Sequence, residues 1–168
     1  MIKDSYYGAA AFYADDIAVL VVERSFELNK FVLPVCLDRS QQPISVNAIG
    51  TTVGWGYTEN NKSSNELLEA NLPYLDLSSC RRKYSASNFV PFLTSDKFCV
   101  LYVNGTGTQV GDSGGGYTQE IQQLHYIYGI TSLKSRDTNE FGVFTRIGAH
   151  MPWLTSTIDS IEANSELK

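Results

Sequence analysis

Apolar residues along this chain follow the two-residue alternation of β-strands more often than the repeat of a helix. Strands with this alternation are expected at residues 45–55, 67–77, 97–103 and 124–131, and a further short strand is expected at 142–146. Residues 17–22 and 31–35 are continuous apolar runs of strand length, which predict buried strands. The pattern therefore predicts a protein built mainly of short strands.

Proline and polar residues modify this picture near the middle of the chain. Pro73 lies within the strand expected at 67–77, and since proline has no N–H, that strand is expected at a sheet edge or with a bulge. Asp76 and Ser78 are expected to cap a short helix over residues 80–84. Only the tail has helical spacing, with apolar residues on one face at Ile147, Met151, Leu154, Ile158 and Ile161. Many short strands before one terminal helix predict an all-β barrel or sandwich.

The length and composition of the chain predict one folded domain. The chain has 168 residues, of which 43% are hydrophobic and 18% are charged, which is enough apolar material for a core. A formal net charge of −5 without any basic run argues against a nucleic-acid partner. The longest apolar run, residues 17–22, is too short to cross a bilayer, so no membrane partner is expected either.

The three cysteines, Cys36, Cys80 and Cys99, fit no zinc-binding pattern with the two histidines, so no metal and no cofactor is expected. The odd count leaves two interpretations open. One disulfide with one unpaired cysteine indicates an oxidising compartment, and three buried thiols indicate the cytosol. Asn61 and Asn104 each begin an N-glycosylation triplet, which matters only in a secreted protein.

The stretch Gly-Asp-Ser-Gly-Gly-Gly at residues 111–116 is the clearest candidate for chemistry. A nucleophilic serine needs an exposed hydroxyl between small neighbours, and it needs backbone N–H groups aimed at the oxyanion that forms on the substrate. Ser113 fits the first need, and the N–H groups of Gly111 and Ser113 fit the second. Asp112 would stabilise the turn if its charge met a cationic partner. The alternative is a glycine-rich surface turn with an incidental serine.

Gly-Asp-Ser-Gly-Gly resembles the sequence around the nucleophile of the chymotrypsin-like (trypsin-type) serine proteases. Other segments resemble this family in the same chain order, and the resemblance covers roughly residues 12–155. They are Asp-Asp-Ile-Ala-Val-Leu at 15–20, Leu-Pro-Val-Cys-Leu at 33–37, Gly-Trp-Gly at 54–56, residues 94–99, Tyr-Gly-Ile-Thr-Ser at 128–132, Gly-Val-Phe-Thr-Arg at 142–146, and Trp153. Residues 93–99 and the third glycine, Gly116, most resemble the protease domains of insect modular serine proteases.

The resemblance implies an all-β fold, the chymotrypsin-like double β-barrel. Residues 1–44 would be a remnant of the first barrel with the linker between barrels, and residues 45–168 would be the complete second barrel with a C-terminal helix. The implied activity is that of a serine endopeptidase, which cleaves protein substrates through an acyl-enzyme and needs no metal or cofactor.

The same resemblance implies roles for individual residues. Ser113 is the expected nucleophile, Asp16 is the expected carboxylate that orients a catalytic histidine, and the N–H groups of Gly111 and Ser113 form the expected oxyanion hole. Asp112 corresponds to the carboxylate that pairs with the freed N-terminus on zymogen activation. The residues expected to bind substrate are Gly107, Ser132, Lys134 and Gly142.

Two of these residues bear on specificity. Gly107 stands where trypsin-like relatives carry the aspartate of the specificity pocket, so an apolar residue is expected before the cleaved bond rather than arginine or lysine. Lys134 replaces a glycine that lines the substrate channel in relatives. It either narrows that channel or is an ordinary surface lysine.

One part of the family pattern is absent. The catalytic histidine of relatives precedes the residue equivalent to Asp16, and none does here, while His125 and His150 are expected to be structural or surface residues. We expect the chain to be part of a longer protease, because residues 17–22 and 31–35 are predicted strands whose covering strands are missing. One rival expectation is a complete, inactive homologue that acts as a protein-binding module. Another is an unrelated β-rich binding domain.

The resemblance also bears on the cysteines and the location. It implies a disulfide between Cys80 and Cys99, and a bond from Cys36 to a segment upstream of the activation site. Secretion follows from these bonds. A serpin-type inhibitor is a further expected partner.

Overall fold

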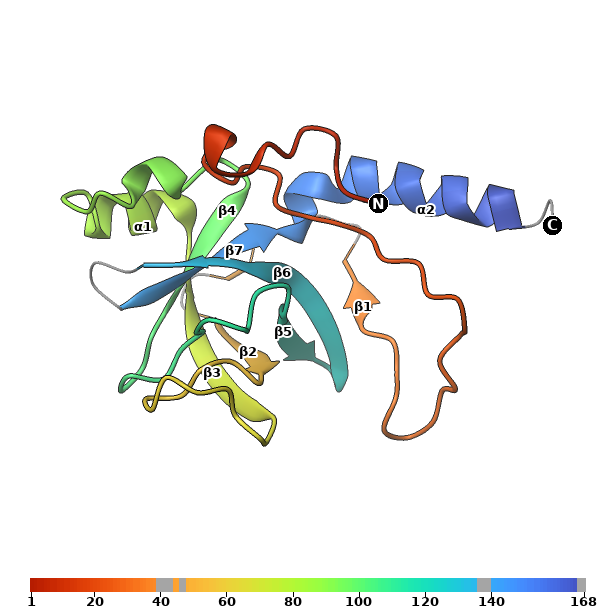
Figure 1. Ribbon diagram of the computed structural model, residues 1–168, viewed down its shortest axis with the longest axis horizontal. Helices are drawn as coiled ribbons and strands as arrows, with labels where there is room; N and C mark the ends of the chain where they lie inside the picture. The colour runs from red at the N-terminus through yellow and green to blue at the C-terminus, as the bar shows by residue number, and fades with distance from the viewer. Residues whose placement is uncertain (39–43, 46–47, 136–139, 166–168) are drawn as a thin grey trace.

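The structure, a computed structural model, describes residues 1–38, 44–45, 48–135 and 140–165, and its centre is a closed β-barrel (Figure 1). Its strands are β1 (Cys36–Leu37), β2 (Ile49–Gly54), β3 (Leu68–Leu75), β4 (Lys97–Leu101), β5 (Gly116–Ile121), β6 (Leu124–Lys134) and β7 (Phe141–Arg146). They lie in the order β1-β6-β5-β2-β3-β4-β7, and β6 also pairs with β7, which closes strands β2 to β7 into the barrel. The expected all-β fold with one complete barrel is confirmed.

The helices lie at the periphery of the barrel (Figure 1). They are α1 (Leu77–Lys83), α2 (Met151–Ser165) and the 3-10 turns η1 (Gly8–Ala11), η2 (Val90–Phe92) and η3 (Ile147–His150). The expected cap at Asp76 is confirmed, because its carboxylate accepts the N–H of Ser79 at 2.9 Å, whereas Ser78 lies within the helix, which begins at Leu77 and not at residue 80. The expected terminal helix is confirmed as α2, whose Met151 and Leu154 pack with Ile17. Within the described residues, no helix reaches the length and apolarity of a membrane-spanning segment.

The barrel interior is filled by aromatic rings from alternate positions of its strands. Phe98 of β4 stacks on Phe144 of β7 with ring centroids 5.5 Å apart, and Tyr117 of β5 meets Phe98 edge to face at 5.4 Å. All three side chains are fully buried. Packing of this kind makes the barrel rigid, and a rigid barrel fixes the positions of the loops at its rim.

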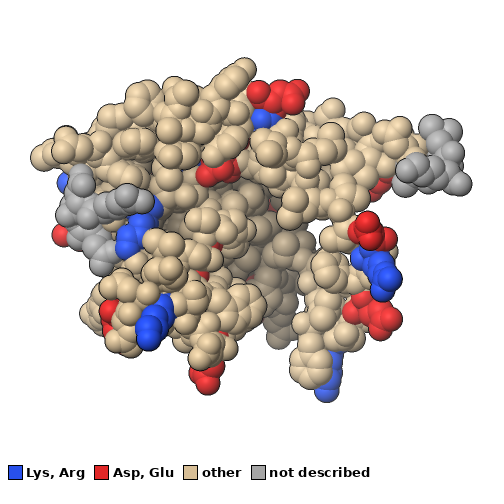
Figure 2. Space-filling view, viewed as in Figure 1, with Lys and Arg blue, Asp and Glu red and all other residues tan. Residues whose placement is uncertain are grey.

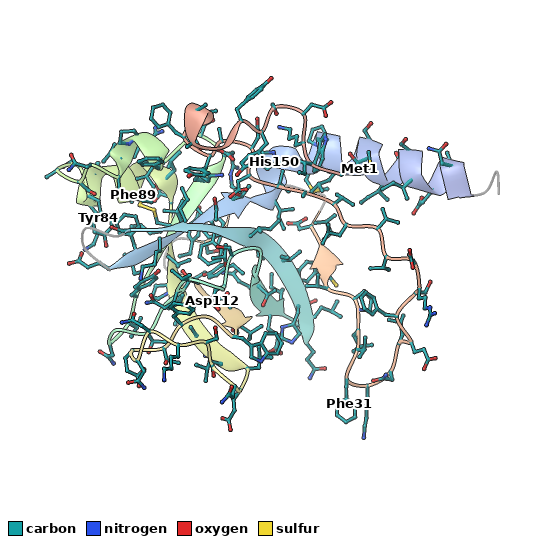
Figure 3. The ribbon with its side chains drawn as sticks, viewed as in Figure 1. Met1, Phe31, Tyr84, Phe89, Asp112 and His150 are labelled. Carbon is teal, nitrogen blue, oxygen red and sulfur yellow. A yellow bond between two sulfur atoms is a disulfide. The ribbon has the colours of Figure 1, made fainter. Side chains whose placement is uncertain are left out.

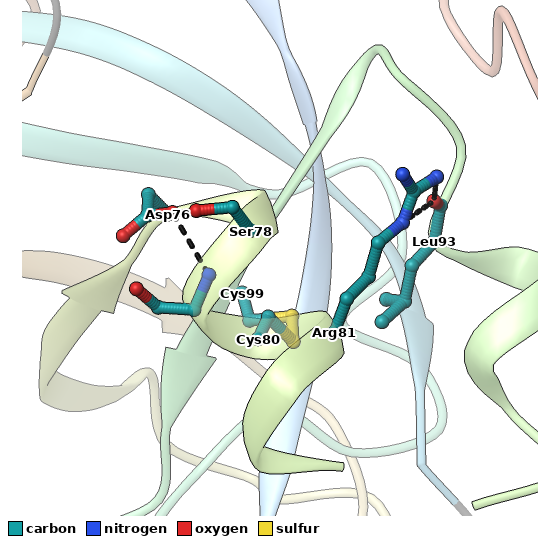
Figure 4. The surroundings of a disulfide bond; sticks show 7 residues. Asp76, Ser78, Cys80, Arg81, Leu93 and Cys99 are labelled. Atoms are coloured by element: carbon teal, nitrogen blue, oxygen red, sulfur yellow. Dashed lines mark hydrogen bonds between the residues drawn. A yellow bond between two sulfur atoms is a disulfide. The ribbon is translucent and has the colours of Figure 1, made fainter. Parts of the chain in front are cut away.

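A disulfide joins α1 to the barrel (Figure 4). Cys80 of α1 bonds Cys99 of β4, with their Cα atoms 6.1 Å apart, and both residues are fully buried. The guanidinium of Arg81 donates to the carbonyl of Leu93, which attaches the segment after α1 to the helix. Cys36 in β1 is a free, half-buried cysteine.

The two apolar runs near the N-terminus are not buried strands, so that prediction is wrong. In residues 17–22 only Ile17 is buried, while Leu20 is 87% exposed, and in residues 31–35 Phe31 is 84% exposed. The described strands supply no partner for either run, and the runs take part only in isolated bridges, Ile2 with Ala18 and Asn29 with Val32. The arm that carries Phe31 stands apart from the barrel (Figures 2 and 3). Apolar composition predicted burial, but burial requires a partner surface.

Two further strand predictions need correction. β3 is neither an edge strand nor bulged, because it pairs with both β2 and β4 in continuous register. Pro73 is opposite Ile49, and pairing with β4 begins only at Tyr74, so the missing N–H of Pro73 interrupts neither ladder. β5 was not predicted. Residues 39–43 of the expected linker lie outside the described residues, and the division at residues 44 and 45 stays a prediction.

Candidate active site

The turn at residues 111–116 presents Ser113 to solvent at the start of β5. Asp112 N donates to the carbonyl of Gln109 at 3.1 Å, and Gly115 N donates to the carbonyl of Asp112 at 3.0 Å, which closes a tight turn. Gly111 has φ +102° and Gly114 has φ +85°, conformations that side chains other than glycine's rarely adopt. The glycines are therefore required by the backbone, and Ser113 between them is exposed.

Two backbone N–H groups in this turn are available to a ligand. Those of Asp112, Gly114 and Gly115 donate to carbonyls, and those of Gly111 and Ser113 make no hydrogen bond with the described residues. A pair of free N–H groups on either side of an exposed hydroxyl is the arrangement that binds an oxyanion.

The Asp112 carboxylate points away from solvent, toward β2 (Figure 3). Its Oδ1 accepts the N–H of Gly56 and its Oδ2 accepts the N–H of Gln109, both at 2.8 Å. A Cβ on Gly54 or Gly56 would lie 2.0 Å or 2.3 Å from a carboxylate oxygen, so Gly-Trp-Gly leaves space for this side chain. Among the described residues no cation pairs with Asp112. Backbone N–H groups, rather than the cationic partner considered from the sequence, stabilise it.

Asp16 lies beside β6 although more than a hundred residues separate the two in the chain. The Ser132 hydroxyl donates to Asp16 Oδ2 at 2.6 Å. Asp16 is half-buried, and the pKa of the nearby Tyr6 is raised by burial and by the charge of Asp16. Ser132 therefore fixes the orientation of the Asp16 carboxylate.

A cleft of about 700 Å³ joins four of the eight residues predicted for catalysis, activation and substrate binding, and neither Asp16 nor Asp112 lines it. Gly111, Ser113, Ser132 and Lys134 all line it, and its opposite wall is aromatic. That wall, which sequence reasoning missed, consists of Phe12, Tyr13, Phe89 and Phe92. Phe12 meets Phe92 edge to face at 5.7 Å, so the N-terminal segment and η2 form the wall together.

Gly107 and Gly142, the other residues predicted to bind substrate, do not line this cleft. Both pack against the ring of Tyr102. The Lys134 ammonium donates to Gln109 Oε1. These two residues line both this cleft and a second cavity of about 590 Å³, which Gly107 also lines.

Neither histidine lines the cleft. His125 is exposed on β6. His150 is buried in η3, where its Nδ1 lies 3.5 Å from Asp15 Oδ1 and its Nε2 lies 3.4 Å from Asp96 Oδ2 (Figure 3). Within the described residues no imidazole therefore lies at Ser113, and His150 has the structural role expected of it.

The charged groups around His150 form a cluster that sequence reasoning missed. Asp15, Asp96 and His150 lie close enough to bind one metal ion. Ammonium groups already occupy these ligand atoms, since Lys3 Nζ lies 2.6 Å from Asp15 Oδ1 and Lys97 Nζ lies 3.0 Å from Asp96 Oδ2. The cluster is better described as an ion network than as a metal centre. Its one sequence signal was Asp96-Lys97 at the start of an otherwise apolar strand.

Comparison with known proteins agrees with this geometry. A family model described as Trypsin matches residues 1–154. CLIP domain-containing serine protease B15 of Anopheles gambiae is 30% identical over 151 residues, which are 86% of this chain and 41% of that protein. Phenoloxidase-activating factor 3 of Holotrichia diomphalia is 30% identical over 149 residues, which are 86% of this chain and 42% of that protein. Melanization protease 1 of Drosophila melanogaster is 29% identical over 163 residues, which are 91% of this chain and 40% of that protein.

The chain thus spans about two fifths of the length of the curated relatives it matches. The matched region includes the whole barrel and the turn of Ser113. The predicted chymotrypsin-like fold and the resemblance to insect modular proteases are therefore both confirmed. This chain belongs to the trypsin family of serine proteases.

Proposed function

We propose that this chain is part of a serine endopeptidase that cleaves proteins through an acyl-enzyme, and that the histidine serving as general base comes from outside these 168 residues. One observation carries the proposal. An exposed Ser113, the free N–H groups of Gly111 and Ser113, and Ser132 lie at one cleft, and Ser132 donates to Asp16.

In the proposed mechanism the hydroxyl of Ser113 loses its proton to the imidazole and attacks the carbonyl carbon of the peptide bond. The N–H groups of Gly111 and Ser113 donate to the oxyanion. Asp16, oriented by Ser132, stabilises the imidazolium. The imidazolium then protonates the leaving amine, and water hydrolyses the acyl group from Ser113. Asp112 is proposed to accept the new N-terminus after activation, next to the N–H groups of Gly56 and Gln109.

Secretion and protein partners belong to the same proposal. The buried Cys80–Cys99 disulfide is the kind of bond that persists in an oxidising compartment. Cys36 is half-buried and free, which suits a bond to an upstream segment. Asn61 and Asn104 are exposed and are therefore open to glycosylation. A serpin-type inhibitor would react with the same serine.

A second candidate is a non-catalytic homologue that binds another protein. The placement of both histidines favours it, because His125 is exposed on β6 and His150 is enclosed by Asp15 and Asp96. With no imidazole at Ser113, the described residues alone provide an oxyanion site without a base.

A fluorophosphonate probe separates the two candidates. The chain alone should not be labelled at neutral pH. A protein translated from the same transcript with its upstream reading frame, and then cleaved at its activation site, should be labelled, and Ser113→Ala should abolish the labelling. Asp16→Asn should slow it at least a hundredfold, and Ser85→Ala, at an exposed serine on the surface beyond α1, should not change it. Stoichiometric labelling of the chain alone, or an in-frame stop immediately upstream, would contradict the proposal.

A further inference from the structure

Asp16 lies in a backbone turn that no helix or strand enforces. Asp15 before it has φ +58°, a left-handed conformation that is unfavourable for a residue with a side chain. The N–H of Ile17 donates to the carbonyl of Asp15 at 2.8 Å, which closes a three-residue turn around Asp16. Such a turn persists only when the surrounding structure holds the residues on both sides of it.

Both neighbours of Asp16 are held by η3 and the first residue of α2. Ile17 is buried and packs with Ile147 and Met151. On the other side of the turn, His150 Nδ1 lies 3.5 Å from Asp15 Oδ1. One short stretch, residues 147–151, therefore contacts the residue before Asp16 and the residue after it.

The surroundings of the buried His150 ring determine which of its nitrogens carries the proton. Lys3 Nζ lies 3.4 Å from Nδ1, and since an ammonium can only donate, Nδ1 is the acceptor. Nε2 then carries the proton, and it faces Asp96 Oδ2 at 3.4 Å. The charged groups around the ring are Lys3, Asp15, Asp96 and, next to Asp96, Lys97. In this arrangement the ring itself is neutral.

The two groups that His150 contacts hold Asp15 from two sides. The Lys3 ammonium, which faces Nδ1, lies 2.6 Å from Asp15 Oδ1. Asp96 Oδ2, which faces Nε2, accepts the backbone N–H of Asp15 at 3.0 Å. Burial alone would raise the pKa of Asp15, but hydrogen bonds from Lys3 and Ser5 and the charge of Lys3 hold that pKa below its ordinary value. The Asp15 carboxylate therefore stays charged and remains bound to the ammonium.

We propose that His150 is a positioning residue for Asp16. By holding Asp15 through its two charged neighbours, it fixes the turn that directs the Asp16 carboxylate to Ser132. Its role is orientation, because no hydrogen bond or ion pair among the described residues joins His150 to Asp16 itself. The inference rests on the proposed role of Asp16 beside the incoming imidazole, but the placement of Asp16 can be measured without that role.

Nuclear magnetic resonance of the chain alone measures this placement. The wild type should show a nuclear Overhauser effect between the side-chain protons of Asp16 and Ser132, whose oxygens lie 2.6 Å apart. His150→Leu should lose this signal and retain the signals among the aromatic rings of the barrel interior. His150→Gln should retain it, because a Gln amide can both donate to the carboxylate and accept from the ammonium. If His150→Leu does not fold, Lys3→Met replaces it with the same expected loss.

The consequence for the reaction is measured in the longer protein after cleavage at its activation site. His150→Leu should slow fluorophosphonate labelling of Ser113, per folded molecule, roughly tenfold to a hundredfold. The midpoint of its pH profile should fall by about 0.5 pH unit or more, because a displaced Asp16 no longer stabilises the imidazolium. A loss of stability alone would leave that midpoint unchanged. His150→Gln should restore rate and midpoint, and His125→Leu, at an exposed histidine of β6, should change neither.

An unchanged signal between Asp16 and Ser132 in folded His150→Leu would overturn the inference. Its absence in the wild type, an equal loss in His150→Gln, or an unchanged pH midpoint would do the same. If the longer wild-type protein is not labelled at Ser113 at all, the proposed endopeptidase is refuted, and the resonance comparison alone then decides whether His150 places Asp16.

Discussion

Removal of Asp96 should destabilise the fold more than removal of any surface charge. The Lys97 side chain is 0% exposed, and its ammonium lies 3.0 Å from Asp96 Oδ2 and 2.9 Å from Thr145 Oγ1. The Asp96 carboxylate also accepts the N–H of Asp15 at 3.0 Å and the hydroxyl of Thr94 at 2.5 Å. The ion pairs of the described residues give Lys97 no other carboxylate. Asp96→Ala would therefore leave a buried ammonium without its counter-ion.

The magnitude follows from the cost of breaking a buried ion pair, which is about 3–5 kcal/mol when one partner is removed. For a chain of this size 1 kcal/mol lowers the melting temperature by about 2–4 °C, so Asp96→Ala should melt roughly 6–20 °C below wild type. Replacing the pair with apolar groups is far less costly. The double variant Asp96→Ala with Lys97→Met should therefore recover more than half of the lost free energy of unfolding.

Urea unfolding with the disulfide intact measures these differences. Fluorescence of Trp55 and Trp153 and far-ultraviolet circular dichroism should give coincident transitions. Asp159→Ala, at an exposed aspartate of α2, is the matched control and should stay within about 0.5 kcal/mol of wild type. A loss below about 1 kcal/mol in Asp96→Ala, or a double variant no more stable than the single one, would refute the buried-pair reasoning.

The pH dependence gives an independent check on Asp96. Burial alone would raise the pKa of its carboxyl, but hydrogen bonds from His150 and Thr94 and the charge of Lys97 hold that pKa well below the ordinary 3.8. A lowered folded-state pKa gives stability that is fully present above the unfolded value and is lost as the pH falls through the folded one. Between pH 4 and pH 2 wild type should therefore lose stability more steeply than the double variant.

Three further changes give smaller effects. Gly56→Ala places a Cβ 2.3 Å from Asp112 Oδ2 and should cost about 1–3 kcal/mol in urea unfolding, whereas Gly148→Ala meets nothing within 4 Å and should change little. Asp76→Ala removes the cap of α1 and should cost about 1 kcal/mol. Because hydrogen bonds from Ser78 and Ser79 lower the pKa of Asp76 to about 2, this difference from wild type should be present above pH 4 and should vanish near pH 2 in thermal unfolding. Reduction of the Cys80–Cys99 disulfide, which closes a loop of sequence separation 19, should lower the free energy of unfolding by about 2–4 kcal/mol in paired reducing and non-reducing titrations.

Periodicity predicted those elements whose burial is one-sided and local. In β3 the alternation through Leu72 and Tyr74, and in α2 the helical spacing from Met151, both correspond to buried positions. β5 has only Tyr117 fully buried among polar neighbours, so no pattern indicated it. The prediction of buried strands at residues 17–22 and 31–35 was wrong for the opposite reason. These residues are apolar, but the described strands provide no surface against which they could be buried.

The residues of the candidate site likewise separate into those that the sequence predicted and those that it did not. Ser113 and its neighbouring glycines were predicted because a tight turn restricts which residue types can stand at consecutive positions. The aromatic wall of the cleft was missed because its residues come from the N-terminal segment and from the segment around η2, which lie far apart in the chain. The His150 network was missed because its members come from both ends of the chain and from β4. Contacts of that kind are fixed by tertiary packing, which a single sequence does not display.

Contacts of residues 15–17 help attach the N-terminal segment to the barrel and its terminal helix. Asp15 adopts φ +58°, a left-handed conformation that costs about 1–2 kcal/mol for a residue other than glycine. Its N–H donates to Asp96 and its carboxylate accepts from Lys3, which offsets that cost, and Ser132 donates to the next residue, Asp16. Beyond residue 20 the segment leaves the barrel and its apolar side chains are exposed. The barrel therefore positions the Asp16 carboxylate by contacts of its own, independently of any sheet formed by the exposed arm. On this reasoning an incoming histidine would meet a serine and a carboxylate that are both held by the barrel, Ser113 by its turn and Asp16 by Ser132.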